Sequence, residues 1–293
     1  MRKSIKAIIC AASAVVMCAA PTIPALSGTL VPTAITAEAA YVETCEVAAK
    51  TTDKTSKYYY TNKLISLDLV CEMVGNEGGS DTYIRIVAPS EVFESMRKDT
   101  VSIPTYIKYN GVKYPVEQID NSTFADKTYI KNVDLSRAYY LKGIGGHAFS
   151  NTEITSIKLP DSLESIGVGA FANCTLLKSV GIQNCVKLTS IGNSAFFNTG
   201  LKVVNVPRNV TVIGYSAFQD CANLEQVNFQ SDPDSDLELD IWGAAFYGTK
   251  LLTINNEREN VVFRKTYIFG STSTTNKIRR VNKVQEPFKK FVK

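Results

Sequence analysis

The sequence predicts a β-rich repeat solenoid of about six coils with an N-terminal β cap. Two periodic features predict it: an Ile-x-x-x-x-Phe motif that recurs six times, and a short apolar strand that follows each copy. The strand starts lie 24, 23, 24, 23 and 27 residues apart. A coil of this length cannot bury its apolar edge alone, so we expect successive coils to stack and share one core.

The first half of each coil carries an isoleucine and, five residues later, a phenylalanine. Alanine precedes the phenylalanine in the last five copies, and glycine follows the isoleucine in four. The constant phase indicates that both apolar side chains enter the core in every coil. The pairs are Ile119/Phe124, Ile144/Phe149, Ile166/Phe171, Ile191/Phe196, Ile213/Phe218 and Ile241/Phe246.

The second half of each coil is predicted to form one strand, starting about six residues after the phenylalanine. Its pattern is apolar-x-x-apolar-x-apolar, and side chains alternate across a strand, so the residues between the apolar positions face solvent. The apolar positions are Ile130/Val133/Leu135, Ile154/Ile157/Leu159, Leu177/Val180/Ile182, Leu201/Val204/Val206, Leu224/Val227/Phe229 and a weaker pair at Leu251/Ile254.

One coil carries the composite pattern L-x-x-I-x-L-P-x-x-L-x-x-I-G-x-x-A-F-x-x-C-x-x-L almost whole, from Ile154 to Cys174. This pattern resembles the BspA-like class of bacterial leucine-rich repeats, over residues 103–256. The resemblance implies a secreted or surface protein that binds proteins or cell surfaces, with short helical or 3-10 turns on the convex side and no catalytic residues. The sequence departs from the pattern at 183–186, which replaces the Leu-Pro turn, and at 232–240, which lengthens one coil.

Residues 1–40 have the features of a secretory signal peptide. Basic residues at positions 2, 3 and 6 precede an uncharged apolar run from Ala7 to Ala20, and Ala37-Glu38-Ala39 offers a small-x-small cleavage pattern. The apolar run is shorter than the roughly 20 residues of a membrane-spanning helix, although an uncleaved anchor stays open as an alternative. We therefore expect a protein that is secreted and possibly retained at the cell surface.

Residues 41–102 lack the repeat and are predicted to form the N-terminal β cap, because solenoids need their apolar ends covered. We expect strands at Ile65 to Val74 and at Tyr83 to Val87. Tyr58, Tyr59 and Tyr60 either pack in this cap or form an exposed patch for sugar or protein. In the first repeat unit, Asn110-Gly111 predicts an inserted β-hairpin.

The C-terminal part is predicted to comprise a cap and linker at 257–276 and a basic tail at 277–293. The tail has a net charge of +6, the first 40 residues +2 and the body −4. The tail either contacts an anionic surface such as wall polymer or lipid head groups, or is solvated; export argues against nucleic acid. Its basic residues are Lys277, Arg279, Arg280, Lys283, Lys289, Lys290 and Lys293.

The composition argues against an enzyme. His147 is the single histidine, so a triad base or a His-rich zinc site would depend on that one ring. It stands in a repeat column of small residues, which indicates a turn residue. The glycine pairs match no phosphate-binding motif. We expect no cofactor, no metal, no catalytic residues and a monomer.

The cysteines left after the predicted signal peptide are too few for a disulfide scaffold. Cys174 and Cys221 share a column with threonines, in a slot expected to be semi-buried, and lie two coils apart. Two coils span about 10 Å, beyond the roughly 7 Å limit for a disulfide. We predict no bond between them, an unpaired Cys185, and leave a Cys45–Cys71 disulfide open.

The candidate binding residues are those that face solvent between the apolar strand positions. They are small and mostly neutral, which suits recognition of a protein or cell-surface ligand over an extended face, or marks mere solvated spacers. Carbohydrate or wall-polymer binding through exposed tyrosines and the tail is the alternative. The candidates are Asn132, Asp134, Ser156, Lys158, Ser179, Val203, Asn205, Gln226, Asn228, Thr253 and Asn255.

The segment 232–240 places an acid at every second position, so an extended strand would gather five carboxylates on one side. Clustered oxygens are what calcium prefers, but the spacing fits no EF-hand loop. A solvated acidic loop is the favoured interpretation over a calcium site.

Overall fold

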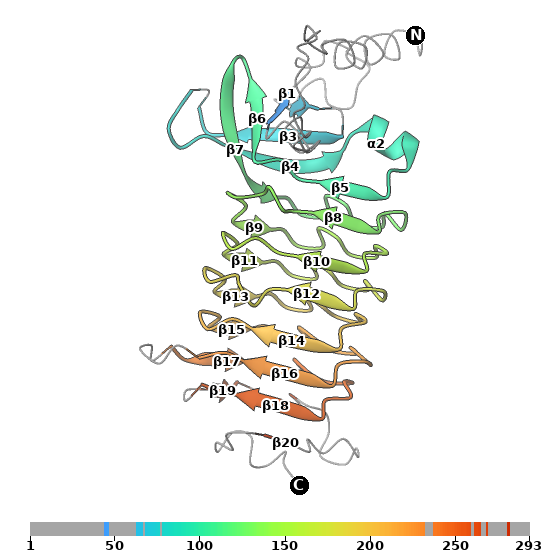
Figure 1. Ribbon diagram of the computed structural model, residues 1–293, viewed down its shortest axis with the longest axis vertical. Helices are drawn as coiled ribbons and strands as arrows, with labels where there is room; N and C mark the ends of the chain where they lie inside the picture. The colour runs from blue at the N-terminus through green and yellow to red at the C-terminus, as the bar shows by residue number, and fades with distance from the viewer. Residues whose placement is uncertain are drawn as a thin grey trace, which may run out of the picture. The chain divides into compact units, whose positions relative to one another are not determined.

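The coils of the repeat region each contain two short strands, so two parallel stacks of strands run along the solenoid (Figure 1). The computed structural model describes residues 44–46, 63–66, 68–76, 78–231, 237–258, 261–264, 268 and 280–281. Within these residues strands dominate and the one helix is short, which confirms the predicted fold class.

The first stack consists of the strands that the sequence predicts. Neighbouring strands are parallel and in register, with Ile157 beside Val180 and Val204 beside Val227. Because side chains alternate, the apolar residues enter the core and the others form a solvent-exposed surface, which we call the strand face on β8 to β18. The strands are β5 (Thr100–Ser102), β8 (Asn132–Asp134), β10 (Ser156–Lys158), β12 (Ser179–Gly181), β14 (Val203–Val206), β16 (Gln226–Phe229), β18 (Thr253–Asn256) and β20 (Arg280–Val281).

The second stack is formed around the motif isoleucines, and the sequence analysis did not predict it. Ile144, Ile166 and Ile191 lie beside one another in consecutive parallel strands. These strands are only two or three residues long because the turn begins directly after the isoleucine. They are β9 (Gly143–Ile144), β11 (Ser165–Ile166), β13 (Ser190–Ile191), β15 (Val212–Ile213), β17 (Leu239–Ile241) and β19 (Val261–Phe263), preceded by β7 (Val112–Ile119).

The short helical or 3-10 turns expected on the convex side are instead irregular turns in the coils between residues 103 and 258. The physical reason is a pair of left-handed residues in each turn, such as His147 with φ 55° and Asn151 with φ 56°. Only three residues separate the two left-handed ones, so a right-handed helix cannot continue through the turn. Hydrogen bonds between coils hold these turns, for example from Phe171 N to Ala195 O at 2.8 Å.

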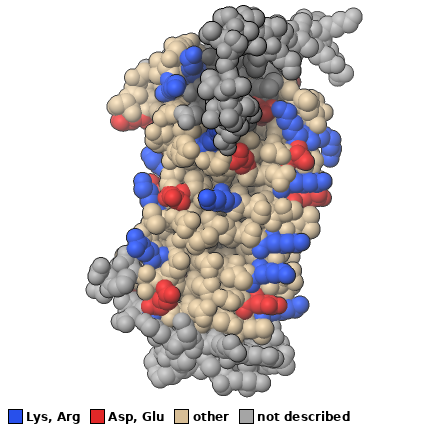
Figure 2. Space-filling view, in the orientation of Figure 1, with Lys and Arg blue, Asp and Glu red and all other residues tan. Residues whose placement is uncertain are grey.

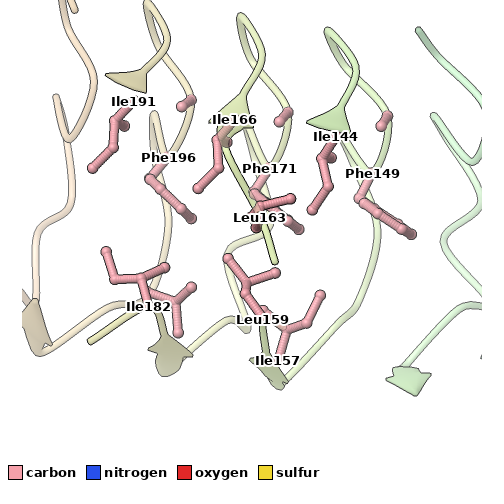
Figure 3. Close-up of a cluster of buried hydrophobic side chains, with 14 of the residues drawn as sticks. Ile144, Phe149, Ile157, Leu159, Leu163, Ile166, Phe171, Ile182, Ile191 and Phe196 are labelled. Carbon is pink, nitrogen blue, oxygen red and sulfur yellow. The ribbon is translucent and has the colours of Figure 1, made fainter. Parts of the chain in front are cut away.

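The core contains a stack of phenylalanine rings, one from each coil. Successive centroids lie 5.2–5.5 Å apart with planes within 13° of parallel. Figure 3 shows Phe149, Phe171 and Phe196 repeating in one orientation, opposite strand residues such as Ile157. Full burial of each ring contributes about 1.5–3 kcal/mol. The six rings are Phe124, Phe149, Phe171, Phe196, Phe218 and Phe246, all fully buried.

The N-terminal cap continues the second stack. β2 (Lys63–Ile65), β3 (Leu69–Val74) and β4 (Tyr83–Pro89) are antiparallel neighbours, and β4 pairs in parallel with β7. The single strand predicted from Ile65 to Val74 is divided, because Ser66 accepts a hydrogen bond from Leu69 N at 3.0 Å and closes a tight turn. β5 already pairs with β8, so the first rung of the strand stack lies at 100–102.

The hairpin at Asn110-Gly111 is confirmed. β6 (Tyr106–Tyr109) pairs with β7, and both turn residues have positive φ, as a two-residue hairpin turn requires. β1 (Thr44–Glu46) pairs with β6. The helix α2 (Glu91–Met96) was not predicted. Ser90 caps it by accepting from Phe93 N at 3.1 Å, and Phe93 anchors it in the core.

The stack continues beyond residue 256. β19 pairs with β17, Phe246 N donates to Ile268 O at 2.8 Å, and β20 pairs with β18. Arg280, which the sequence analysis placed in the basic tail, therefore lies beside Thr253 in a strand. Its spacing of 27 residues from Thr253 equals that between Gln226 and Thr253.

Candidate functional site

The strand face carries all eleven candidate binding residues, each exposed or half-buried. They form two columns: the first residue of each strand from Asn132 to Thr253, and the third residue from Asp134 to Asn255. The residue between them, such as Val180 or Val204, is buried. Alternation of side chains thus exposes these positions, while their role in binding stays a prediction.

At the C-terminal end of the strand face, asparagine side chains bind one another. Asn228 Nδ2 donates to Asn205 Oδ1, and Asn255 Nδ2 donates to Asn228 Oδ1 at 2.7 Å. Gln226 Nε2 also donates to Asn228 Oδ1, at 2.8 Å. This asparagine ladder satisfies much of the hydrogen-bonding capacity that the sequence analysis assigned to a ligand.

The N-terminal end of the strand face is occupied by local bonds. Asn132 Nδ2 donates to Thr100 Oγ1 at 3.4 Å, and Asp134 Oδ1 accepts from Ser136 N at 2.9 Å. Ser156, Lys158 and Ser179 lie between this end and the asparagine ladder and are exposed. The middle of the face therefore has the most accessible polar groups.

A shallow depression of about 520 Å³ lies in that middle region, across β10, β12 and β14. Gly181 stands in its column between Lys158 and Asn205, so the column lacks one side chain at this rung. Lys158, Lys178 and Lys202 line the depression. Figure 2, in the orientation of Figure 1, shows basic side chains along both margins of the repeat region and few charges between them over β14 to β18.

The cysteines of the repeat are structural and fully buried, so the slot predicted as semi-buried is closed to solvent. Cys174 and Cys221 are free thiols that each contact a threonine of the preceding coil, at 3.3 and 3.1 Å. Cys185 is also a free, buried thiol. Burial raises the pKa of Cys174, that of Cys185 to about 12 and that of Cys221 to about 11. Protonated thiols are poor nucleophiles.

The Cys45–Cys71 pair, whose disulfide the sequence left undecided, is only partly within the described residues. Cys71 is buried in β3, whereas Cys45 lies on β1, and the side chain of Cys45 lies outside the described part of the chain.

His147 is a turn residue, as its column predicts. It is exposed, and its backbone is left-handed with φ 55°. Its ring covers Gly169 of the next coil so closely that a Cβ at Gly169 would lie 2.4 Å from His147 Cε1. The glycine in this column therefore makes room for the histidine ring.

Two of the acids in the predicted calcium segment are bound to an arginine. Arg264 contacts Asp240 at 2.6 Å and also pairs with Glu238, while residues 232–236 lie outside the described residues. Across the described ranges, no group of three or more His, Cys, Asp and Glu side chains is arranged to hold a metal ion. The calcium alternative therefore loses two of its five ligands to an ion pair.

The other predicted contact groups are only partly described. Tyr58, Tyr59 and Tyr60 and all basic tail residues except Arg280 lie outside the described residues. A different tyrosine pair is present: the hydroxyls of Tyr106 and Tyr140 lie 2.9 Å apart, and Tyr139 beside them is 61% exposed.

Arg258 is a structural residue that the sequence analysis missed. Its side chain is buried and donates to backbone carbonyls of two earlier coils, those of Pro207, Arg208, Val210 and Gln230. Burial lowers its pKa to about 10. The contacts span 28 to 51 residues, so no local pattern reveals them.

None of the helices in the described part of the chain is both long and apolar enough to cross a membrane.

Comparison with known proteins finds similarity both in the repeat sequence and in the fold. Six copies of a family model described as BspA type leucine rich repeat region match residues 91–225 and 209–288. A leucine rich repeat protein from T. pallidum is 24% identical, and the match covers 66% of this chain and 82% of that chain with a TM-score of 0.53. A leucine rich cell surface protein from Faecalibacterium prausnitzii is 17% identical over 72% of this chain and 73% of that chain, with a TM-score of 0.37. None of the curated proteins compared with this chain matches it.

Proposed function

Because this chain belongs to the BspA-type leucine-rich repeat family, we propose that it is an exported, non-catalytic protein that recognises another protein at a cell surface. The strand face is the binding surface in this adhesin-like role. The proposal rests on one observation: successive strands expose small polar residues on one face, while apolar residues of the same strands are buried in the core. Stacked coils with such a face commonly form extended binding surfaces.

The chemistry of the described residues supports a non-catalytic role. The buried thiols of Cys174, Cys185 and Cys221 have raised pKa values and stay protonated at neutral pH. His147 lies on an exposed turn with its ring against Gly169. Export is supported by the basic start and apolar run of residues 1–40.

The test is binding of the purified protein to intact bacterial and epithelial cells. Val203→Arg and Thr253→Arg place large side chains on the strand face and should abolish binding, because their bulk would hold a partner away from the face. Val168→Arg and Tyr247→Arg, at exposed turn positions, are the matched controls and should bind normally. Protease treatment of the cells should remove the receptor.

Two results would overturn this proposal. Binding that survives both strand-face substitutions would exclude the face, and binding that survives protease treatment would exclude a protein receptor. Turnover in a broad hydrolase screen would contradict the non-catalytic role.

Carbohydrate or wall-polymer binding is a second candidate, favoured by the exposed Tyr139 and the Tyr106/Tyr140 pair together with the basic C-terminal residues. Binding to purified wall polymer should be lost at high salt. Exposed charges are screened within about 8 Å at physiological ionic strength, and this distance becomes shorter as the ionic strength rises. Tyr139→Ala should reduce any binding to wall polymer that remains at high salt. Unchanged binding in both cases would exclude this candidate.

A further inference from the structure

The depression on the strand face exists because Gly181 has no side chain. Gly181 pairs with Lys158 as an ordinary strand residue, and its φ is not positive. Its backbone conformation therefore does not require glycine. A Cβ there would lie 3.3 Å from Lys158 Cα and 3.5 Å from Lys158 Cγ. In the next three coils the same position carries asparagine. Glycine therefore lets the backbone of Lys158 approach closely, and it leaves this rung without the side chain that the next three coils carry.

Three lysines surround this space without a carboxylate partner. Within the described part of the chain, no ion pair involves Lys158, Lys178 or Lys202, and all three are exposed. By contrast, Lys98 pairs with Asp68, and Lys142 pairs with Glu117. The depression thus has a local excess of positive charge beside an open floor in which polar side chains alternate with Ile157, Val180 and Val203.

The positions of the lysines indicate the size of the anion. Lys178 and Lys202 precede β12 and β14 on adjacent rungs, about 4.8 Å apart, at one end of the depression. Lys158 lies beside Gly181 at the other end, about three residues along the strand direction, or roughly 10 Å. An extended peptide places alternate side chains about 7 Å apart, so two carboxylates of one segment could reach both ends.

The remaining lining favours a peptide over a polysaccharide. Ser156, Ser179, Gln183 and Asn205 supply hydroxyl and amide groups that can bond to peptide carbonyls and carboxylates. The lining contains no aromatic ring, whereas sugar rings are commonly held against aromatic faces.

We propose that the depression over Gly181 binds an extended acidic peptide segment of the protein partner, with Lys158, Lys178 and Lys202 contacting its carboxylates. This inference rests on the proposed function, since it names the chemistry that the strand face recognises.

The first test uses the full chain and fluorescein-labelled hexaglutamate, with hexaglutamine as the neutral probe, in fluorescence anisotropy. Hexaglutamate should bind and hexaglutamine should not. The triple variant Lys158→Gln, Lys178→Gln, Lys202→Gln should bind hexaglutamate about tenfold more weakly, the factor expected from losing three exposed ion pairs. The matched triple variant Lys113→Gln, Lys187→Gln, Lys250→Gln removes the same charge from exposed sites and should bind normally. Equal losses in both triples would overturn the proposal.

Two further measurements separate a shaped site from diffuse positive charge, including that of the C-terminal residues. Hexaglutamate should protect Lys158, Lys178 and Lys202 from acetylation, read by mass spectrometry, and leave Lys113, Lys187 and Lys250 reactive. Gly181→Asn fills the depression without changing charge and should weaken binding about as much as the lysine triple variant, with an unchanged circular dichroism spectrum. Protection spread over all six lysines would overturn the proposal. If Gly181→Asn alters the circular dichroism spectrum, the pattern of lysine protection from acetylation decides whether the depression is the binding site.

The outcomes also separate this inference from the proposed function. If Val203→Arg and Thr253→Arg abolish cell binding but the Lys158/Lys178/Lys202 triple variant does not, the strand face binds a protein and the acidic-peptide inference is wrong. If a sulfated polysaccharide binds at the three lysines and hexaglutamate does not, the ligand class is wrong. If the lysine triple variant loses hexaglutamate but every variant binds cells normally, the depression binds acidic peptides and the proposed function fails.

Discussion

Cys174 Sγ and Thr152 Oγ1, in consecutive coils, donate to the same backbone carbonyl, that of Phe149, at 3.1 and 2.8 Å. The same arrangement recurs in Cys221 and Thr199 at the carbonyl of Phe196. The threonine thus donates to the phenylalanine carbonyl of its own coil, and the cysteine of the next coil donates to that same carbonyl, which ties the two coils together.

The free energy of unfolding should fall as the pH rises from about 9 to about 11. Burial raises the pKa of Cys221 from 9.0 to about 11, so the unfolded chain loses this proton at lower pH than the folded protein does. The stabilising contribution is therefore complete below pH 9 and is lost as the pH rises toward 11. In urea denaturation, the free energy of unfolding of Cys221→Thr should decline less steeply with pH than that of the unsubstituted protein. Parallel declines would contradict the raised pKa.

Phe171→Ala should destabilise the protein by about 3–5 kcal/mol, because it leaves a cavity in the middle of the ring stack and removes two stacked neighbours. Urea denaturation followed by circular dichroism measures this. The control Val168→Ala, at an exposed turn position in the same coil, should change the free energy by less than about 0.5 kcal/mol. Similar values for the two variants would exclude the ring stack as a major source of stability.

Arg258→Met should loosen the turn at 207–210. The substitution keeps much of the apolar volume but leaves buried carbonyls such as that of Val210 without this donor, at a cost of about 1–3 kcal/mol for each group left unsatisfied. Hydrogen exchange should speed up in residues 203–231 and stay unchanged in residues 143–182. Arg258→Lys keeps the charge without the forked donors and should speed up hydrogen exchange in the same residues. Full protection of residues 203–231 in Arg258→Lys would show that the charge alone is enough to hold the turn.

Asn228→Ala should destabilise the C-terminal coils by about 1–3 kcal/mol, because it removes the shared centre of three side-chain hydrogen bonds. Thermal unfolding measures the loss. Thr253→Ala, on the adjacent rung and outside these bonds, is the control and should have little effect. If Asn228→Ala instead leaves stability unchanged and weakens cell binding, the residue contacts the ligand and its ladder bonds contribute nothing.

Sequence reasoning predicted the core of the repeat well and its surface less well. The burial of Phe149, Ile157 and Ile166 follows from spacing alone, since each coil repeats the contacts of the last. The second strand stack was missed because two residues per coil, such as Ser165 and Ile166, are too few to show a strand pattern. Continuation of the stack to Arg280 had a signal in the sequence: Ile268-Phe269 stands 23 residues after Ala245-Phe246.

The candidate site shows the same division. Spacing identified which residues face solvent on the strand face, and all eleven do. It did not reveal that Asn205, Asn228 and Asn255 bind one another, or that Gly181 opens a space between Lys158 and Asn205.

The sequence by itself determined the period, the identity of the core residues and the direction in which each strand residue points. It could do so because a solenoid coil contacts only its neighbours, so a local pattern repeated in phase specifies the whole stack. Only the tertiary structure decided which exposed polar groups are already satisfied, where Arg258 reaches across two coils, and which lysines lack a partner. These depend on distances between side chains and carbonyls of different coils, which the residue spacing does not contain.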